Sequence, residues 1–273
     1  MYGIIINDDK RYDYTQKYLE AHNINIKSFD YNKLKDQKDI NLKSKADFIL
    51  FTFREELNKN IFDDKFFSGI KKDALIFSGL ENNYIKKSCE QNNLNYEALM
   101  DLDYISCLNS VPTAEGVIYY LIKSLKKTID GSDILIIGYG NCGKTLADKL
   151  YKLNARVYIN TKKDLDYAIA IKNKIIPVYK LDFKQKKFDA IINTAPCETI
   201  FNSDLKSLSN KILLIDITKS GFDINLAREK NIDSARILSI PSKFSPETAG
   251  EILGKYIYEK VTKCSKIKKL VSE

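Results

Sequence analysis

The sequence predicts an α/β protein made of two Rossmann-like parallel-sheet domains with an inter-domain cleft. Three observations support this prediction. Short, continuous apolar runs such as residues 47–52 and 74–78 alternate with helix-like stretches, a pattern typical of parallel βαβ units. A glycine turn at residues 138–143 lies between an apolar run and a helix-like stretch. A second series of apolar runs follows that turn, so the alternation occurs twice along the chain.

The glycine turn predicts a dinucleotide site. Its glycines have the G-x-G-x-x-G spacing, with Asn141 and Cys142 between the last two. Gly138 allows a tight turn, Gly140 lets the backbone approach a pyrophosphate, and Gly143 lets the following helix pack close to the strand. The free N–H groups at the start of that helix attract phosphates. The alternative is a purely structural glycine turn.

The end of the next strand, at residues 155–159, favours NADP over NAD. An NAD site usually has an acid there that binds the ribose 2′-hydroxyl. Here the strand is followed by Asn160, Thr161, Lys162 and Lys163, and the first acid is Asp164. A hydroxyl and two lysines suit a 2′-phosphate, which an acid would repel. The alternative is that the lysines belong to a solvated turn.

Later strand ends complete the predicted cofactor site. The run at residues 190–196 is a buried-type strand that ends in small polar groups and a proline. Thr194, Ala195 and Pro196 are therefore candidates to line the cofactor, since open α/β sheets bind ligands at the carboxyl ends of their strands. Asp216 ends the next strand and is a further candidate.

The first domain is predicted to supply the substrate side. Its first strand, residues 3–7, is followed by Asp8 and Asp9, whose carboxylates would repel a pyrophosphate. Arg54 is the expected carboxylate clamp; the alternative is a surface arginine paired with Glu55 or Glu56. The candidates at the strand ends of this domain are Thr52, Arg54, Ser78 and Gly79.

The segment at residues 109–116 joins the two domains and concentrates polar groups. Ser110 or Thr113 is expected to cap a helix over residues 117–125, with Glu115 in its first turn. Asn109, Ser110 and Thr113 are predicted substrate ligands, because a cleft between domains is where such groups reach a substrate. The alternative is an ordinary capped helix.

The predicted domains are residues 1–112, for the substrate and catalytic lobe, and residues 113–245, for the dinucleotide. A loop at residues 241–245 precedes a last helix, 246–262, which is expected to return to the first domain, and residues 263–273 form a basic tail.

Composition excludes several classes of protein. The chain has 273 residues, 44% of them hydrophobic, and a formal net charge of +8. The charge is spread through the chain without the interleaved aromatic residues of a nucleic-acid binder, and it favours anionic small molecules instead. Neither a signal peptide nor a membrane span is indicated, so we expect a cytoplasmic protein. The scattered cysteines and the single histidine, His22, indicate no metal site.

The chain resembles the A subunit of dipicolinate synthase nearly end to end. The most specific segment is Asn-Ser-Val-Pro-Thr-Ala-Glu-Gly. The segments that carry the resemblance are residues 77–80, 109–116, 130–132, 138–143, 192–196 and 248–253. The resemblance implies a two-domain, dehydrogenase-like protein, an oligomer that acts with a flavoprotein-like B subunit in the mother cell of a sporulating bacterium. It further implies that NADP accepts a hydride from a dihydrodipicolinate-type substrate.

Two alternatives and one catalytic role stay open. The chain could hold NADP as a non-catalytic module of the complex, or oxidise another small carboxylic acid, as dehydrogenases of the shikimate or folate type do. Those families usually show a lysine–aspartate pair in the first lobe, and Lys71, Lys72 and Asp73 are nearby but read as a turn. If burial raised its pKa, Glu115 could accept the proton that is released on oxidation.

Overall fold

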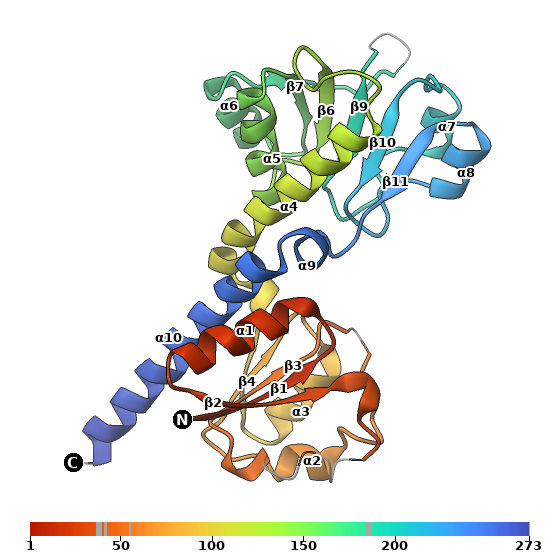
Figure 1. Cartoon of the computed structure of the whole chain (residues 1–273). Helices are drawn as coiled ribbons and strands as arrows, with labels where there is room; N and C mark the ends of the chain where they lie inside the picture. Colours follow the sequence, from red (N-terminus) through yellow and green to blue (C-terminus); the bar gives the residue numbers. More distant parts are fainter. Residues whose placement is uncertain (37–39, 41–42, 55, 184–186, 273) are drawn as a thin grey trace. The chain divides into compact units, whose positions relative to one another are not determined.

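The protein is an α/β chain in two compact units. The first unit comprises residues 1–109 and 245–273, and the second comprises residues 110–244 (Figure 1). Each unit holds a parallel sheet with helices interleaved along the chain, which confirms the predicted Rossmann-like class. The computed structural model describes residues 1–36, 40, 43–54, 56–183 and 187–272, with side chains as far as Lys263.

The sheet of the first unit has the strand order β2-β1-β3-β4-β5, and each strand pairs in parallel with its neighbours. The inner strands β1, β3 and β4 are the apolar runs that the sequence singled out, and their side chains are buried because helices cover both faces of such sheets. β5 was not predicted, because its polar sequence lacks an apolar run. The bounds are β1 (Tyr2–Asn7), β2 (Asn25–Asp30), β3 (Phe48–Phe51), β4 (Leu75–Ser78) and β5 (Asn95–Ala98).

Helices of this unit begin at side-chain caps. The carboxylates of Asp9 and Asp63 and the amide of Asn82 accept hydrogen bonds from the first backbone N–H groups of their helices. These helices are α1 (Lys10–Ala21), α2 (Asp64–Ser68) and α3 (Asn83–Gln91), and the 3-10 turns are η1 (Tyr31–Lys33), η3 (Lys43–Lys45) and η4 (Leu99–Asp101).

The last helix, α10 (Pro246–Ser272), lies along α1 (Figure 1). The Thr15 hydroxyl donates to the Gly250 carbonyl at 2.9 Å. A Cβ at Gly250 would lie 2.3 Å from the Arg11 carbonyl oxygen, so only glycine allows this approach. Further along α10, Tyr256 and Lys260 both bind the Glu97 carboxylate of β5. The C-terminal helix is therefore part of the first unit.

The helix α4 (Asp103–Ser124) corrects the predicted start of a helix after residue 113. The helix begins at Asp103 and contains Pro112, so Ser110 and Thr113 lie within it and the predicted caps are wrong. A proline in a helix interior removes one backbone hydrogen bond without always ending the helix. The division between the two compact units falls within α4, between Asn109 and Ser110.

The sheet of the second unit has the order β11-β10-β9-β6-β7-β8. β6 lies between β7 and β9, so the strand order reverses there, at the place where such sheets bind ligands. Ile134, Leu135 and Ile136 of β6 are fully buried. The bounds are β6 (Asp133–Ile137), β7 (Arg156–Asn160), β8 (Ile176–Pro177), β9 (Ala190–Asn193), β10 (Leu213–Asp216) and β11 (Asp233–Arg236).

One helix of the second unit replaces a predicted loop. Residues 241–245 were expected to be irregular, but α9 (Ile240–Phe244) is helical and Phe244 contacts Tyr119 and Tyr120 of α4. A Cβ at Gly116 would lie 2.2 Å from Ile240, so α4 and α9 pack closely at this glycine. The remaining helices are α5 (Asn141–Lys152), α6 (Asp164–Lys172), α7 (Asn202–Leu205) and α8 (Ile224–Glu229).

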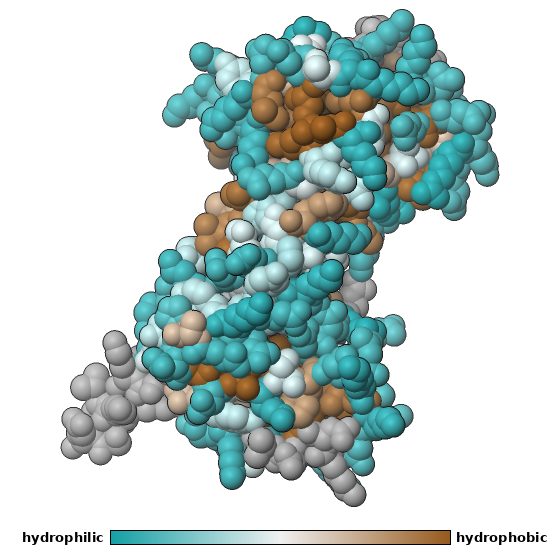
Figure 2. Space-filling view, viewed as in Figure 1, coloured by the Kyte–Doolittle hydropathy of each residue, from teal (hydrophilic) through white to brown (hydrophobic). Residues whose placement is uncertain are grey.

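Hydrophilic residues cover much of the face shown in Figure 2, with smaller apolar areas between them. In the part of the chain that the structure describes, no helix has both the length and the apolar character to cross a membrane.

Candidate functional site

The glycine turn after β6 has the geometry that its sequence predicts. Gly138 has a φ of +99°, which side chains rarely adopt. A Cβ at Gly143 would lie 2.3 Å from the Gly138 carbonyl oxygen, so α5 can approach β6 this closely only at a glycine. Gly140 is exposed, and a Cβ there would meet no heavy atom within 4 Å. The strand, the turn and the helix therefore leave open space in front of Gly140.

The N-terminus of α5 faces that space without a side-chain cap. Gly140 is the N-cap residue, and as a glycine it has no side chain that could cap the helix. Asn141 and Cys142 are the first two helical residues, and both are partly exposed. Uncapped N–H groups and the positive end of the helix dipole attract anions, so this helix start is suited to a pyrophosphate.

The end of β7 carries a hydrogen-bonded cluster of polar side chains. The Tyr167 hydroxyl donates to the Thr161 carbonyl at 2.9 Å, and the Asn160 amide donates to the Val178 carbonyl at 2.7 Å. The Thr161 hydroxyl donates to Asp166 Oδ2 at 3.3 Å. Lys144 of α5 forms an ion pair with Asp166 Oδ1 at 3.1 Å. An acid that sequence reasoning did not consider is thus close to the predicted ribose site.

Lys162, the predicted partner of the 2′-phosphate, is exposed directly after Thr161. Asn160 and Thr161 are held by the cluster, so their backbone positions are fixed while Lys162 projects into solvent. This arrangement leaves a cation at the place where the sequence predicts an adenosine ribose.

The end of β9 borders the glycine turn directly. The Thr194 backbone N–H donates to the Ile137 carbonyl at 2.8 Å, and a Cβ at Gly138 would lie 2.6 Å from the Thr194 hydroxyl oxygen. Ala195 is partly exposed and Pro196 is exposed beside it. The structure thus brings the predicted residues Thr194, Ala195 and Pro196 to the same edge of the sheet as Gly138.

Asp216 does not fit the cofactor role that the sequence suggested. Its side chain is fully buried, and Oδ1 accepts from Asn193 Nδ2 and from both the backbone N–H and the hydroxyl of Thr218. Oδ2 accepts from the Gly221 N–H at 3.0 Å and from Arg236 Nε at 2.9 Å. A carboxylate offers about four acceptor positions. The carboxylate is therefore saturated, and Asp216 positions the loop after β10.

Residues of α4 in the second unit contact α5. The hydroxyls of Ser110 and Thr145 are 2.6 Å apart, and Thr113 forms a hydrogen bond with Cys142. Burial raises the pKa of the Cys142 thiol, and the Thr113 hydroxyl opposes that shift only in part. The predicted substrate residues Ser110 and Thr113 are therefore neighbours of the predicted cofactor residue Cys142.

Glu115 lies on α4 but lacks the burial that a proton acceptor would require. Its side chain is 56% exposed, and its carboxylate forms an ion pair with Lys149 of α5 at 2.9 Å. A carboxyl gains basicity from desolvation and loses it beside a cation. The catalytic role of Glu115 required burial of its carboxylate, and within the described second unit this carboxylate is exposed and paired with a lysine.

Arg54, the predicted carboxylate clamp, is anchored by residues far from it in sequence. Its Nε binds Asp8 Oδ2 at 3.1 Å, its Nη2 donates to Asn32 at 2.8 Å, and the guanidinium lies 4.6 Å from the Tyr31 ring centroid. Burial raises the pKa of Asp8, while the Phe53 N–H and Arg54 oppose that shift. The alternative was a surface arginine paired with Glu55 or Glu56, of which Glu55 lies outside the described residues.

The other substrate candidates of the first unit are buried and bonded. The Ser78 hydroxyl donates to the Leu80 carbonyl and lies 2.6 Å from the Tyr96 hydroxyl. The Thr52 hydroxyl accepts from the Arg54 N–H at 3.1 Å. A Cβ at Gly79 would lie 2.3 Å from the Phe53 ring. These groups shape the sheet edge, and Arg54 is the candidate with an exposed donor group. Asn109 is buried at the end of this unit.

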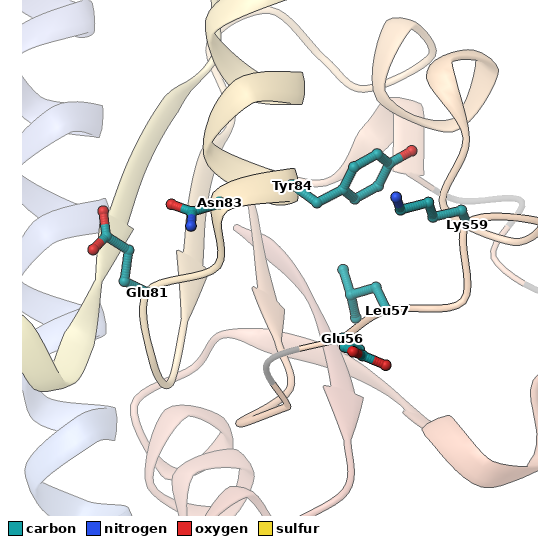
Figure 3. A pocket seen from close by; sticks show the side chains of 6 residues that line it. All are labelled: Glu56, Leu57, Lys59, Glu81, Asn83 and Tyr84. Atoms are coloured by element: carbon teal, nitrogen blue, oxygen red, sulfur yellow. The ribbon is translucent and has the colours of Figure 1, made fainter.

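A pocket of ≈ 670 Å³ opens in the first unit between the chain after β3 and the start of α3 (Figure 3). Lys59 reaches toward the Tyr84 ring, with its Nζ 5.1 Å from the ring centroid. Glu81 forms an ion pair with Lys86. The predicted substrate residues are not among the described residues that line the pocket, which are Glu56, Leu57, Lys59, Glu81, Asn83 and Tyr84.

Sequence reasoning missed two groups of this site. Asp166 lies near the end of β7 because α6 begins directly after Lys163. The sequence signal that could have revealed it is an acid in the first turn of a helix. Arg236 reaches Asp216 across neighbouring strands, and no local sequence pattern indicates that contact. Within the described residues there is no group of three or more His, Cys, Asp or Glu side chains placed to hold a metal ion.

Comparison with known proteins shows what this chain resembles. Residues 119–242 match the family described as D-isomer specific 2-hydroxyacid dehydrogenase, NAD binding domain. The chain is also 30% identical over 184 residues to the A subunit of dipicolinate synthase from Bacillus subtilis (strain 168), an alignment that covers 66% of this chain and 62% of that relative. The resemblance to this dipicolinate synthase component is confirmed. The chain thus spans less than two thirds of the length of this curated relative.

Solved structures of the same dipicolinate synthase component share the fold. The Bacillus subtilis protein superposes with a TM-score of 0.85 at 23% identity, and 97% of each chain is covered. The Bacillus halodurans protein gives a TM-score of 0.83 at 22% identity, covering 95% of this chain and 97% of that one. With the family match, this fold supports a dehydrogenase-like chain whose second unit is built to hold a nicotinamide dinucleotide.

Proposed function

We propose that this chain is the A subunit of a dipicolinate synthase and that it oxidises a dihydrodipicolinate-type substrate with NADP, acting with a B subunit. The observation that carries the proposal is the uncapped start of α5 beside the open space at Gly140. The similarity to the Bacillus subtilis dipicolinate synthase component supplies the substrate class and the partner.

The proposed cofactor contacts follow the edge of the second sheet. The backbone at the start of α5, from Gly140 to Gly143, would hold the pyrophosphate, because N–H groups at a helix start attract phosphates. The Gly138 N–H already donates to the Asn160 carbonyl at 2.8 Å, so Gly138 would serve through its turn conformation. Thr161 and Lys162 would hold the adenosine end, and Thr194, Ala195 and Pro196 would line the nicotinamide side. When bound, the dinucleotide supplies a hydride acceptor at its nicotinamide ring.

The proposed reaction turns a dihydropyridine ring into an aromatic pyridine. The substrate loses one hydride to the dinucleotide and one proton to a base, so the charges and electrons balance. Aromatisation supplies much of the driving force, so a strong base is not required. Solvent water can take the proton, and Glu115 takes it only in an assembly that buries this carboxylate. Normal turnover of a Glu115→Gln variant would remove Glu115 from the mechanism.

The substrate's carboxylates need donors that stay in place. We propose Arg54 as the main one, because its contacts with Asp8, Asn32 and Tyr31 fix the guanidinium while 45% of the side chain stays exposed. A pre-oriented guanidinium loses less side-chain entropy on binding a carboxylate. Ser110 and Thr113, which contact α5, are the proposed donors from the second unit.

The test is NADP reduction by freshly prepared dihydrodipicolinate, with this chain alone, with the B subunit on its own and with both. We expect turnover whenever this chain is present, and an Arg54→Met variant with a raised KM but an unchanged affinity for NADPH. An equal KM in wild type and Arg54→Met would remove Arg54 from the substrate site. Turnover by the partner without this chain, at the rate of the mixture, would contradict the proposal.

A non-catalytic role for the chain is the second candidate. The exposure of Glu115 and its pairing with Lys149 favour it, because the second unit then lacks the one acid–base group that the sequence suggested. NADPH binding by this chain, without turnover of dihydrodipicolinate in any mixture, would support a dinucleotide-binding module. Turnover of a different small carboxylic acid would instead assign another dehydrogenase activity.

A further inference from the structure

The Asp166 carboxylate contacts Thr161 at the end of β7, and both of its oxygens have partners within the protein. Oδ1 lies 3.1 Å from Lys144 Nζ, and Oδ2 accepts from the Thr161 hydroxyl at 3.3 Å. The Asp166 side chain is 12% exposed, whereas that of Lys144 is 41% exposed. The acid is therefore held inward, and the lysine lies between it and solvent.

This arrangement differs from an NAD site in one respect. At an NAD site the acid at the strand end accepts hydrogen bonds from the ribose hydroxyls. Here the acid lies five residues beyond Thr161, in the first turn of α6, and Lys144 compensates its charge. The exposed Lys162 and Lys163 follow the strand directly. The local charge at the strand end is therefore positive, even though an acid is present.

We propose that the Lys144–Asp166 ion pair determines the choice of dinucleotide: Lys144 masks the carboxylate that contacts Thr161 and would otherwise favour NAD and repel a 2′-phosphate. The inference rests on the proposed dinucleotide site and goes beyond it by naming the specificity-determining pair. Lys144 is also the first residue after Gly143, so the phosphate turn and the ribose site are linked through one side chain.

Two substitutions are expected to shift the preference in opposite directions. Lys144→Met leaves the Asp166 charge uncompensated, so the ratio of NADPH affinity to NADH affinity should fall by about tenfold. Asp166→Asn removes the negative charge and releases Lys144 toward the ligand, so the ratio should rise by about tenfold. The double variant should return toward the wild-type ratio, because the two substitutions act through one pair.

The matched control is Lys149→Met. Lys149 lies on the same helix and also forms one ion pair, with Glu115 at 2.9 Å. This variant loses the same single charge and one ion pair, but the partner of Lys149 lies on α4, whereas the partner of Lys144 lies in the first turn of α6. Its ratio of NADPH to NADH affinity should equal that of wild type. Thermal unfolding of every variant would confirm that the fold is intact before affinities are compared.

The measurement is the dissociation constant of NADPH and of NADH for the full chain and each variant, by fluorescence titration or calorimetry without substrate. Tighter binding of NADPH by wild type, with opposite shifts in Lys144→Met and Asp166→Asn, is the expected result. Equal ratios in these variants and in Lys149→Met would overturn the inference and leave the proposed site intact. Wild type that prefers NADH would also overturn it, and wild type that binds neither dinucleotide would overturn both proposals.

Discussion

In both units a strand of a parallel sheet leads into a helix, but the residue that caps the helix differs. An aspartate caps the helix in the first unit, and a glycine stands at that position in the second. In the first unit β1 leads into α1 through Asp8 and Asp9, and the Asp9 carboxylate caps the helix and binds Arg11 through both oxygens. In the second unit β6 leads into α5 through glycines, and no side chain caps the helix. A helix start that a carboxylate already occupies cannot attract a phosphate, whereas an uncapped one can.

The two helix starts show that a Rossmann-like strand–helix unit is not by itself a nucleotide site. In both units an apolar strand runs into a helix of the same length, α1 and α5 each having 12 residues. What differs is which groups satisfy the first N–H groups of the helix. The first unit uses the Asp9 carboxylate, and the neighbouring Asp8 binds Arg54. The second unit has a glycine at the N-cap, and we propose that a ligand binds there.

The buried Asp216–Arg236 pair is expected to give the largest loss of stability. Arg236→Met would leave a fully buried carboxylate without its cation, and breaking a buried pair in this way costs about 3–5 kcal/mol of unfolding free energy. Urea unfolding measures it. Arg228→Met, an exposed arginine of the same unit, is the control and should change stability by less than about 0.5 kcal/mol. Equal effects of the two variants would contradict the positioning role of Asp216.

Asp9→Ala tests the capped edge of the first unit. It removes the α1 cap and both bonds to Arg11, which is only 5% exposed, so we expect a loss of about 2–4 kcal/mol. Asp9→Asn keeps a capping oxygen without the charge and should lose less. The NADPH affinity of both variants should match wild type, since the phosphate turn is in the other unit. A large drop in that affinity would show that the two edges do not act separately.

Gly143→Ala tests the close approach of α5 to β6. The new Cβ would lie 2.3 Å from the Gly138 carbonyl oxygen, so the backbone must shift, at a cost of about 1–3 kcal/mol. Because the same shift moves the N–H groups of the turn, NADPH affinity should fall together with stability. Thermal unfolding and NADPH titration measure the two effects. A variant with wild-type stability would mean that α5 is less closely packed than described.

The pH dependence of the second unit should show a small effect from Asp133. Arg156 and Tyr158 hydrogen-bond this carboxylate and hold its pKa below the ordinary value, although burial opposes that shift. A lowered pKa in the folded state means that the stabilisation is present above the unfolded pKa and is lost as pH falls through the folded one. Arg156→Met should therefore lose less stability than wild type as pH falls below about 4, the ordinary aspartate value, through the lowered folded pKa. Because both side chains are partly exposed, the difference should be small.

The fold class was predictable because it depends on local patterns. The apolar runs of β1, β3, β4, β6 and β9 are continuous, and the glycine spacing fixes a strand–turn–helix unit. The helix α4 was not predictable in the same way, since Pro112 looks the same at the first turn of a helix as in its interior. α9 was missed because it has only five residues, with Pro241 as the second, and so short a segment carries too little periodicity to indicate a helix.

Within the candidate site, the sequence predicted correctly the residues whose backbone conformation or lack of a side chain matters. Gly138 and Gly143 have the conformation and the close contact that their spacing implies. The side-chain partners of Asp216, Asp166 and Arg54 come from other elements, so they depend on how strands and helices pack, which the sequence pattern does not specify. The roles of these residues in binding stay predictions for the experiments above.

The measurement that tests the central claim most directly is NADPH binding by Gly140→Asp. The substitution gives α5 the kind of carboxylate cap that Asp9 gives α1, at a position whose extended backbone and open surroundings accept a side chain. We expect a melting temperature equal to or above that of wild type, because aspartate is a favoured N-cap. NADPH affinity should fall by about a hundredfold, since a fixed carboxylate would face the pyrophosphate, whereas Gly140→Ala should weaken binding far less. Equal NADPH affinity in wild type and Gly140→Asp would contradict the claim that the uncapped start of α5 holds the dinucleotide.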